Sequence, residues 1–266
     1  MEMILKVEKG NFAYNKEKTV LKDINFELNQ GDVLAILGPN GVGKTTLLKC
    51  IMNIHPWTDG HSMLDEKFIS RLSEKELWQN VAYVPQAKNL AFSYTAEEMV
   101  LLGRSAYLGL FSRPGKKDYR IAQEAMESIG IAHLRKKSCN QMSGGELQMV
   151  LIARALASKP KILILDEPES NLDFKNQLVI LDTIKNLSAH SKISCIFNTH
   201  YPDHALQVST HSLILNRDLS NFYGKSTQII NRDTLKKSFG VHVFINDTVF
   251  ENKKYQHIIP LSIVTG

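Results

Sequence analysis

One glycine-rich stretch, residues 38–46 with the sequence G-P-N-G-V-G-K-T-T, limits what this chain can fold into more than any other feature. It fills the pattern G-x-x-x-x-G-K-[ST], a loop whose backbone N–H groups converge on a phosphate, with Gly38, Gly43, Lys44 and Thr45. In such loops the lysine reaches the β- and γ-phosphates of a nucleotide and the threonine hydroxyl binds Mg²⁺. The stretch therefore predicts a site for a nucleoside triphosphate with Mg²⁺.

The segments on either side of this loop supply the context that the pattern needs. Residues 33–37 are a continuous apolar run typical of a buried strand, and residues 46–52 carry apolar side chains at helical spacing. The start of that helix would add free N–H groups and partial positive charge. A glycine turn that matches by chance is the alternative, and the flanking strand and helix argue against it.

Composition describes a globular chain and narrows its partners. Of 266 residues, 43% are hydrophobic and 22% charged, and the net charge of +5 is spread out, which favours a solvated surface over a nucleic-acid footprint. Cys50, Cys139 and Cys195 fit no metal spacing and are expected to be buried free thiols. No apolar run approaches the roughly 18 to 20 residues that span a bilayer, and no secretory signal opens the chain. We therefore expect a soluble, cytoplasmic protein that reaches a membrane only through a partner.

Apolar runs that alternate with helical patterns predict an α/β fold with a mostly parallel sheet. Period-two alternation over residues 3–30 predicts strands around a polar turn at 15–18. Further strands or short apolar runs are expected at 81–84, 162–167, 193–197, 212–215 and 228–230. Helix signals fill much of 95–158 and interrupt the alternation, as an inserted helical subdomain would.

Serine and threonine residues mark expected helix starts. Ser73 and Thr95 each stand before acidic residues in a capping arrangement. Residues 118–130 show an amphipathic helical pattern, and a further helix is expected from about 176 to 188. Residues 103–115 contain Gly, Ser and Pro and are expected to form a loop.

Two adjacent acids, Asp166 and Glu167, follow the apolar run 162–165. A carboxylate there is costly unless it faces a cation or solvent, and P-loop enzymes hold Mg²⁺ with an acid in this place. A second carboxylate at the carboxyl edge of the sheet could deprotonate an attacking water. A strand that simply ends at the surface is the alternative, and the phosphate-binding loop favours the metal-and-base interpretation.

The tripeptide Ser143-Gly144-Gly145 opens a helix and is a second potential anion site. Alone it is weak evidence, because an ordinary helix start has the same pattern. The glycine-rich loop at 38–46 and this tripeptide cannot obviously hold the same phosphate within a single subunit. Two copies facing head to tail would each supply one loop to a shared nucleotide.

These motifs, in this order over about residues 4–216, resemble those of the nucleotide-binding subunits of ATP-binding-cassette (ABC) transporters. The resemblance implies a P-loop NTPase core with a mostly parallel sheet, an N-terminal antiparallel β-subdomain and an inserted helical subdomain. It implies one ABC ATPase domain, whose parts are expected at about 1–89 and 159–230 (catalytic core), 90–158 (helical subdomain) and 231–266 (C-terminal extension).

The resemblance assigns ATP and Mg²⁺ to particular residues. It implies Glu167 as catalytic base, His200 as the switch histidine at the γ-phosphate, and Gln86 as the link from Mg²⁺ and water to the membrane partner. The magnesium ligands it implies are Thr45, Gln86 and Asp166. The nucleotide contacts it implies are Tyr14, Gly38, Pro39, Asn40, Gly41, Val42, Gly43, Lys44, Thr45, Thr46, Ser143, Gly144, Gly145, Glu146 and Asp173. Tyr14 would stack on adenine; from its position alone, strand packing is the expected role.

Four positions depart from the family pattern. Met142 replaces the usual Leu, Glu146 the usual Gln, Leu147 a frequent Arg and Glu169 the usual Thr. Residues 142–146 resemble the family's signature motif, usually written L-S-G-G-Q, and its Ser143, Gly144 and Gly145 are intact, so nucleotide contact is expected to survive. Leu147 and Glu169 bear on the rate of hydrolysis.

Residues 94–104 and 108–114 narrow the resemblance to importers of iron-siderophore, haem and cobalamin complexes, a set that includes some molybdate and tungstate importers. The tail Phe239-Gly240-Val241 is similar to theirs. The implied function is the ATP-hydrolysing subunit of a binding-protein-dependent importer, peripheral on the cytoplasmic face of the inner membrane. The implied partners are two copies of a transmembrane permease subunit, a second copy of this chain as a head-to-tail dimer and, indirectly, a substrate-binding protein, with no nucleic acid.

Two other functions are weighed against this one. Soluble ABC ATPases of DNA repair or translation usually carry two cassettes or a coiled-coil insertion, and this chain has one cassette and no heptad run. A binding module without hydrolysis is disfavoured by Glu167 and His200. Apolar residues at 87–94, Phe92 above all, are the expected docking surface for the permease, with packing inside the subunit as the alternative.

Overall fold

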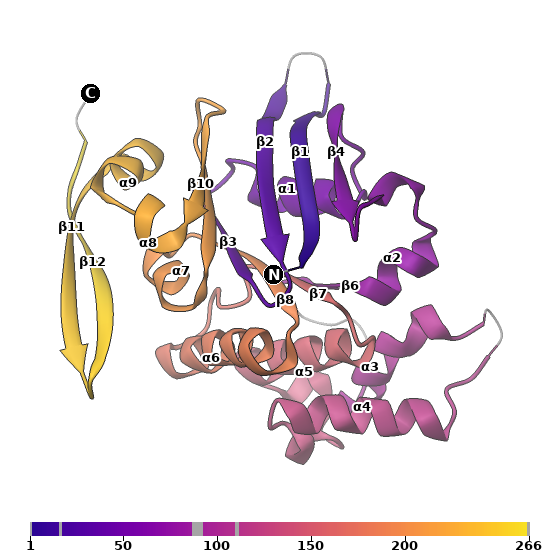
Figure 1. The fold of residues 1–266 in the computed structure, drawn as a ribbon. Helices are drawn as coiled ribbons and strands as arrows, with labels where there is room; N and C mark the ends of the chain where they lie inside the picture. The colour runs from indigo at the N-terminus through magenta and orange to yellow at the C-terminus, as the bar shows by residue number, and fades with distance from the viewer. Residues whose placement is uncertain (1, 16–17, 87–92, 110–111, 265–266) are drawn as a thin grey trace. The chain divides into compact units, whose positions relative to one another are not determined.

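The computed structural model describes residues 2–15, 18–86, 93–109 and 112–264. The chain divides into two compact units: unit 1 comprises Met1–Arg71 and Ile196–Gly266, and unit 2 comprises Leu72–Cys195. Figure 1 labels their helices and strands. None of the helices in the described part of the chain combines the length and the apolar character that crossing a bilayer requires.

An antiparallel sheet opens unit 1. Its strands, in hydrogen-bonded order, are β2 (Thr19–Asn29), β1 (Met3–Ala13), β4 (Asp59–Leu64) and β5 (Lys67–Phe68), followed by the short helix η1 (Ile69–Arg71). Ile24, Phe26 and Leu28 of β2 are buried, because alternate side chains of a strand lie on one face. The alternation predicted over residues 3–30 is confirmed.

A second group of strands in unit 1 carries the glycine-rich loop. These are β3 (Val33–Leu37), which pairs in parallel with β9 (His211–Leu215), then β10 (Asn221–Lys225) antiparallel to β9, and β8 (Ser194–Thr199) next to β3. Every residue of β3 is buried, as expected for a strand covered on both faces. The loop that follows β3 leads into α1 (Lys44–Ile51), so the predicted strand, loop and helix are confirmed.

The C-terminal part of unit 1 contains short helices and a hairpin. The helices are α7 (Pro202–Val208), α8 (Ser226–Ile229) and α9 (Arg232–Phe239), and the hairpin joins β11 (Val241–Phe250) to β12 (Lys253–Ile263). The hairpin, yellow in Figure 1, contacts α9 through β11 and α7 through β12. The Ile258 N–H donates to Asp203 Oδ1 at 2.8 Å and fixes β12 to α7.

Helices predominate in unit 2. They are α2 (Glu74–Asn80), α3 (Ala96–Leu101), η2 (Leu102–Tyr107), α4 (Lys116–Ser128), η3 (Ala132–Leu134), η4 (Cys139–Gln141), α5 (Gly144–Ala157) and α6 (Phe174–Ser191). Both α3 and α4 pack against α5 (Figure 1). The apolar side chains of α5 are buried. Strands β6 (Val81–Val84) and β7 (Ile162–Asp166) pair in parallel.

Side-chain caps begin the helices where the sequence predicts them. Ser73, Thr95 and Ser143 each accept a hydrogen bond from an N–H of the first turn, and a glutamate three residues on bonds back. This capping box satisfies two donors that would otherwise lack partners. The helix expected at 176–188 is longer, because Asp173 caps it from further upstream.

Two other expectations do not match the structure. Part of the loop predicted at 103–115 is the 3₁₀ helix η2, in which a Cβ on Gly103 would lie 1.9 Å from the Arg154 carbonyl oxygen. The apolar run at 228–230 belongs to α8 and its C-cap and not to a strand. Residues 87–92 of the predicted docking surface, Phe92 among them, lie outside the described residues.

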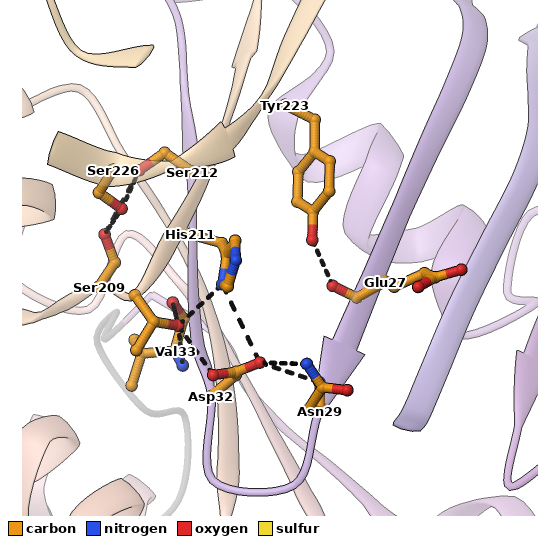
Figure 2. Close-up of polar contacts among 10 residues, drawn as sticks. Glu27, Asn29, Asp32, Val33, Ser209, His211, Ser212, Tyr223 and Ser226 are labelled. Carbon is orange, nitrogen blue, oxygen red and sulfur yellow. Dashed lines mark hydrogen bonds and ion pairs between the residues drawn. The ribbon is translucent and has the colours of Figure 1, made fainter. Parts of the chain in front are cut away.

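A polar cluster fixes the turn between β2 and β3 in unit 1 (Figure 2). Asp32 is buried and accepts hydrogen bonds from the Asn29 backbone N–H at 3.1 Å and from the Thr210 hydroxyl at 3.2 Å. The Tyr223 hydroxyl donates to the Glu27 carbonyl oxygen at 2.6 Å. The Thr210 bond therefore holds the turn before β3 to the start of β9, and the Tyr223 bond joins β10 to β2.

The thiols match their predicted state. Cys50, Cys139 and Cys195 are all buried and unbridged. Burial raises the pKa of Cys50 and of Cys195 to about 12 and also raises the pKa of Cys139. All three therefore stay protonated at neutral pH.

Candidate nucleotide and magnesium site

The loop between β3 and α1 follows a path that only glycine allows at two positions. Gly38 has φ 146° and Gly43 has φ 110°. A Cβ on Gly38 would lie 2.8 Å from the Leu215 carbonyl oxygen, and one on Gly43 would lie 2.8 Å from Val20 Cγ1. The path leads into the first turn of α1, where the partial positive charge of a helix start suits an anion.

Lys44 turns back over this loop. Its Nζ donates to the carbonyl oxygens of Gly38 at 2.9 Å and Pro39 at 3.3 Å, and the residue is only 5% exposed. A buried ammonium group needs such partners. A phosphate oxygen would bind it more strongly than a neutral carbonyl, because charge-assisted hydrogen bonds are roughly twice as strong. The loop and Lys44 together fit a phosphate group.

Two further predicted residues of unit 1 flank this loop. Tyr14 is 55% exposed, which does not fit strand packing, and its hydroxyl lies 3.1 Å from Thr46 Oγ1. Its ring meets Phe12 edge to face, with centroids 5.0 Å apart. His200 follows β8, the strand next to β3, and its ring lies 4.2 Å from that of Tyr201. Unit 1 therefore brings Tyr14 to Thr46 and places His200 at the end of a neighbouring strand.

In unit 2, the acid at the end of β7 has a partner on β6. Asp166 is 9% exposed, and its Oδ2 accepts a hydrogen bond from the Tyr83 hydroxyl at 2.9 Å. Burial raises the pKa of Tyr83, and the nearby Asp166 carboxylate raises it further. Gln86 is half-buried and follows β6 after one proline. Of the predicted metal residues, Asp166 thus ends one of two paired strands, and Gln86 follows the other.

Glu167 has an unusual backbone conformation. Its φ is 45°, in the left-handed region, and its Oε2 accepts a hydrogen bond from the Ser170 hydroxyl at 3.2 Å. The Ser170 N–H also donates to the Glu167 carbonyl oxygen at 3.1 Å. Such a conformation costs about 1–3 kcal/mol and is concentrated at functional sites. At Glu167 the backbone leaves the extended conformation of β7, immediately after Asp166.

The signature segment is held by its own cap. Ser143 Oγ accepts from the Glu146 N–H at 3.2 Å, and Glu146 Oε2 accepts from the Ser143 N–H at 2.8 Å. Lys137 Nζ donates to both carboxylate oxygens of Glu146 at 2.8 Å. The Lys137 bond, and then the Ser143 N–H, hold the pKa of Glu146 below its ordinary value. The glutamate that replaces the family's glutamine therefore stabilises the start of α5.

The two signature glycines lie against the start of α6. A Cβ on Gly145 would stand 2.4 Å from Asn176 Cγ, and one on Gly144 would stand 3.2 Å from Leu172 Cδ2. Asn176 Nδ2 in turn donates to Asp173 Oδ2 at 3.0 Å. Unit 2 therefore brings the signature segment and Asp173 together.

These side chains are of the types that Mg²⁺ binds. Magnesium takes oxygen ligands, usually one or two carboxylates with several waters, and the Asp166 carboxylate and Thr45 hydroxyl are such groups. Among the described residues, no group of three or more His, Cys, Asp or Glu side chains could hold a metal.

Sequence reasoning misses several partners of the predicted residues, among them Tyr83, Lys137 and Asn176. The Tyr83 contact depends on which strands are neighbours, and no local pattern gives that order. Asn176 could have been found, because it stands at the third helical position after the Asp173 cap.

Comparison with known proteins identifies relatives along the whole chain. The ABC transporter family model matches residues 21–170. The chain is 34% identical over 262 residues to the molybdate import ATP-binding protein MolC of Haemophilus influenzae, covering 98% of both. It is 36% identical over 228 residues to a probable iron chelatin transport ATP-binding protein of Helicobacter pylori, covering 85% of this chain and 89% of the relative. A solved metal-chelate type ABC transporter in an inward-facing conformation matches with a TM-score of 0.88 and 32% identity, covering 98% of both chains.

Proposed function

The chain belongs to the ABC transporter family as an ATP-binding subunit that hydrolyses ATP to power import, and we propose which residues and partners carry this out. The observation that supports the proposal most is the glycine path of residues 38–43 with Lys44 folded over it. Lys44 exchanges its carbonyl partners for the β- and γ-phosphates of ATP. The exposed ring of Tyr14 stacks on adenine, and the rest of residues 38–46 bind phosphate oxygens.

Asp166, with Thr45 and Gln86, would hold Mg²⁺ in this proposal. The bound ion would neutralise charge on the β- and γ-phosphate oxygens. Glu167 accepts a proton from the attacking water. Its position directly after Asp166 supports this role, as does the hydrogen bond from the Ser170 hydroxyl, which orients the Glu167 carboxylate. His200 contacts the γ-phosphate.

The signature segment acts on the nucleotide of a second copy. ABC ATP-binding subunits form dimers, and the finer proposal is a head-to-tail dimer in which Ser143, Gly144, Gly145 and Glu146 face the partner's ATP. The exposure of Ser143 and Gly144 supports this. Asp173, held beside Gly145 through Asn176, would contact the same interface.

Subunits of this family associate peripherally with a membrane and work with permease components. We propose two permease copies, a substrate-binding protein that acts indirectly, and a place on the cytoplasmic face of the inner membrane. The cargo is a metal chelate or a metal oxyanion. Relatives named for molybdate and iron chelatin support this class, and they do not favour a soluble role in DNA repair or translation.

Uptake in a strain that lacks this gene tests the function. Ferric siderophore, haem, cobalamin, molybdate and tungstate would be supplied separately as labelled compounds. We expect uptake of one of them to fall to background and to return with the wild-type gene, but not with Glu167→Gln. Glu74→Gln, which changes an exposed glutamate of α2, is the matched control and should restore uptake. Normal uptake of all five, with sensitivity to DNA damage or a translation defect, would refute the importer.

A further inference from the structure

Tyr83 makes a side-chain contact with Asp166, the acid at the end of β7. Its hydroxyl donates to Asp166 Oδ2 at 2.9 Å. The contact joins two paired strands, since Val84 of β6 is in register with Leu165 of β7. Tyr83 is half-buried and Asp166 is 9% exposed, so water competes little for this bond.

The chemistry of the pair fixes the direction of this bond. A phenol hydroxyl carries a proton that it can donate, and a carboxylate oxygen accepts it. A carboxylate has two oxygens and about four acceptor sites, so it can accept a hydrogen bond and bind a metal at the same time.

We propose that Tyr83 is a positioning residue for the magnesium acid: its hydroxyl holds the Asp166 carboxylate in the orientation that binds the ion. Groups that orient a metal ligand in this way typically change metal affinity by roughly 10- to 100-fold. The inference rests on the proposed role of Asp166 in binding Mg²⁺. Because β6 also leads to Gln86, the same bond ties the strand before Gln86 to that acid.

A purely structural role for Tyr83 is the competing explanation, and Mn²⁺ binding separates the two. The full chain would be loaded with a non-hydrolysable ATP analogue and titrated with Mn²⁺ by electron paramagnetic resonance. Tyr83→Phe removes one oxygen atom and should weaken Mn²⁺ binding about tenfold. Nucleotide affinity in EDTA should stay within about twofold of wild type, because the phosphate-binding loop is unchanged.

A matched control exists in the same unit. Tyr107 also donates its hydroxyl to one acceptor, the Ser158 carbonyl oxygen at 2.8 Å. Tyr107→Phe loses an equivalent bond away from Asp166 and should leave Mn²⁺ affinity unchanged. Placing 4-aminophenylalanine at position 83 restores an N–H donor and should recover most of the lost affinity, which a packing role would not explain.

Asp166→Asn separates failure of this inference from failure of the proposed function. We expect it to lose Mn²⁺ binding. If it does and Tyr83→Phe binds Mn²⁺ as wild type does, the positioning role is wrong while the metal site stands. If Asp166→Asn keeps wild-type Mn²⁺ affinity, the proposed metal site itself is wrong.

Discussion

Arg104, in the segment that narrows the family resemblance, holds three parts of unit 2 together. The residue is 5% exposed, and its guanidinium donates from Nε to Asp118 Oδ1 at 3.0 Å and from Nη1 to the Ala157 carbonyl oxygen at 2.9 Å. It also lies 4.0 Å above the centroid of the Tyr107 ring. These contacts join η2 to the start of α4 and the end of α5.

Arg104→Met should therefore destabilise the subunit strongly. Removing one partner of a buried ion pair typically costs about 3–5 kcal/mol. We expect the lower end, about 3 kcal/mol, because Asp118 keeps a hydrogen bond from the Gly115 N–H at 3.0 Å. At about 2–4 °C for each kcal/mol in a chain of this size, the melting temperature should fall by about 6–12 °C.

Thermal unfolding followed by circular dichroism measures this loss. Arg120→Met is the control, because Arg120 forms a 3.4 Å pair with Glu124 in which its side chain is 72% exposed. Exposed pairs contribute little, so this variant should melt close to wild type. A double-mutant cycle with Asp118→Asn should show coupling of about 1–3 kcal/mol. A fall of under about 2 °C for Arg104→Met, or strict additivity in the cycle, would refute the argument.

Other variants test the site and its cap. Glu167→Gln should bind ATP and form a stable dimer but hydrolyse on the order of 100- to 10,000-fold more slowly, and near-normal turnover would remove it from the role of base. Lys44→Ala should lose ATP affinity in the monomer, whereas Ser143→Ala should keep it and lose ATP-dependent dimerisation in sedimentation; equal losses of monomer binding would contradict the shared site. Because Lys137 lowers the pKa of Glu146, that carboxylate adds stability above its unfolded pKa of about 4.3, and this stability is lost as pH falls through the lower folded value. In melting curves recorded at several pH values, Glu146→Gln should reduce the fall in melting temperature at acidic pH. An unchanged fall would show that the Glu146 carboxylate contributes no such stability.

The parts of the fold that follow from short-range rules are the ones that the sequence predicts. The buried strand at Val33–Leu37 is a continuous apolar run, and the caps at Ser73, Thr95 and Ser143 precede glutamates at the expected spacing. The local sequence predicts the hairpin β11–β12 less clearly than it predicts this strand and these caps. Its turn uses Glu251 and Asn252 with positive φ in place of glycine, and several of its apolar side chains are exposed.

The candidate site divides in the same way. Motif spacing is enough to name Lys44, Asp166 and Glu167 as candidates, and their roles stay predictions. The strain at Glu167 and the bond from Tyr83 depend on backbone conformation and on strand pairing. Neither is encoded by the types of the neighbouring residues, so no reading of the local sequence could supply them.

Because all three thiols are buried, the native chain should react very little with cysteine-directed reagents. The thiolate is the reactive form, and a pKa of about 12 at Cys50 and Cys195 leaves each with roughly three thousandfold less thiolate at neutral pH than an ordinary cysteine. A cysteine introduced at an exposed position, such as Phe174 at the start of α6 (88% exposed), would therefore take a spin label or fluorophore almost alone. Distances between two such labels, one on each copy, could then be followed through the ATP cycle without first removing the native cysteines.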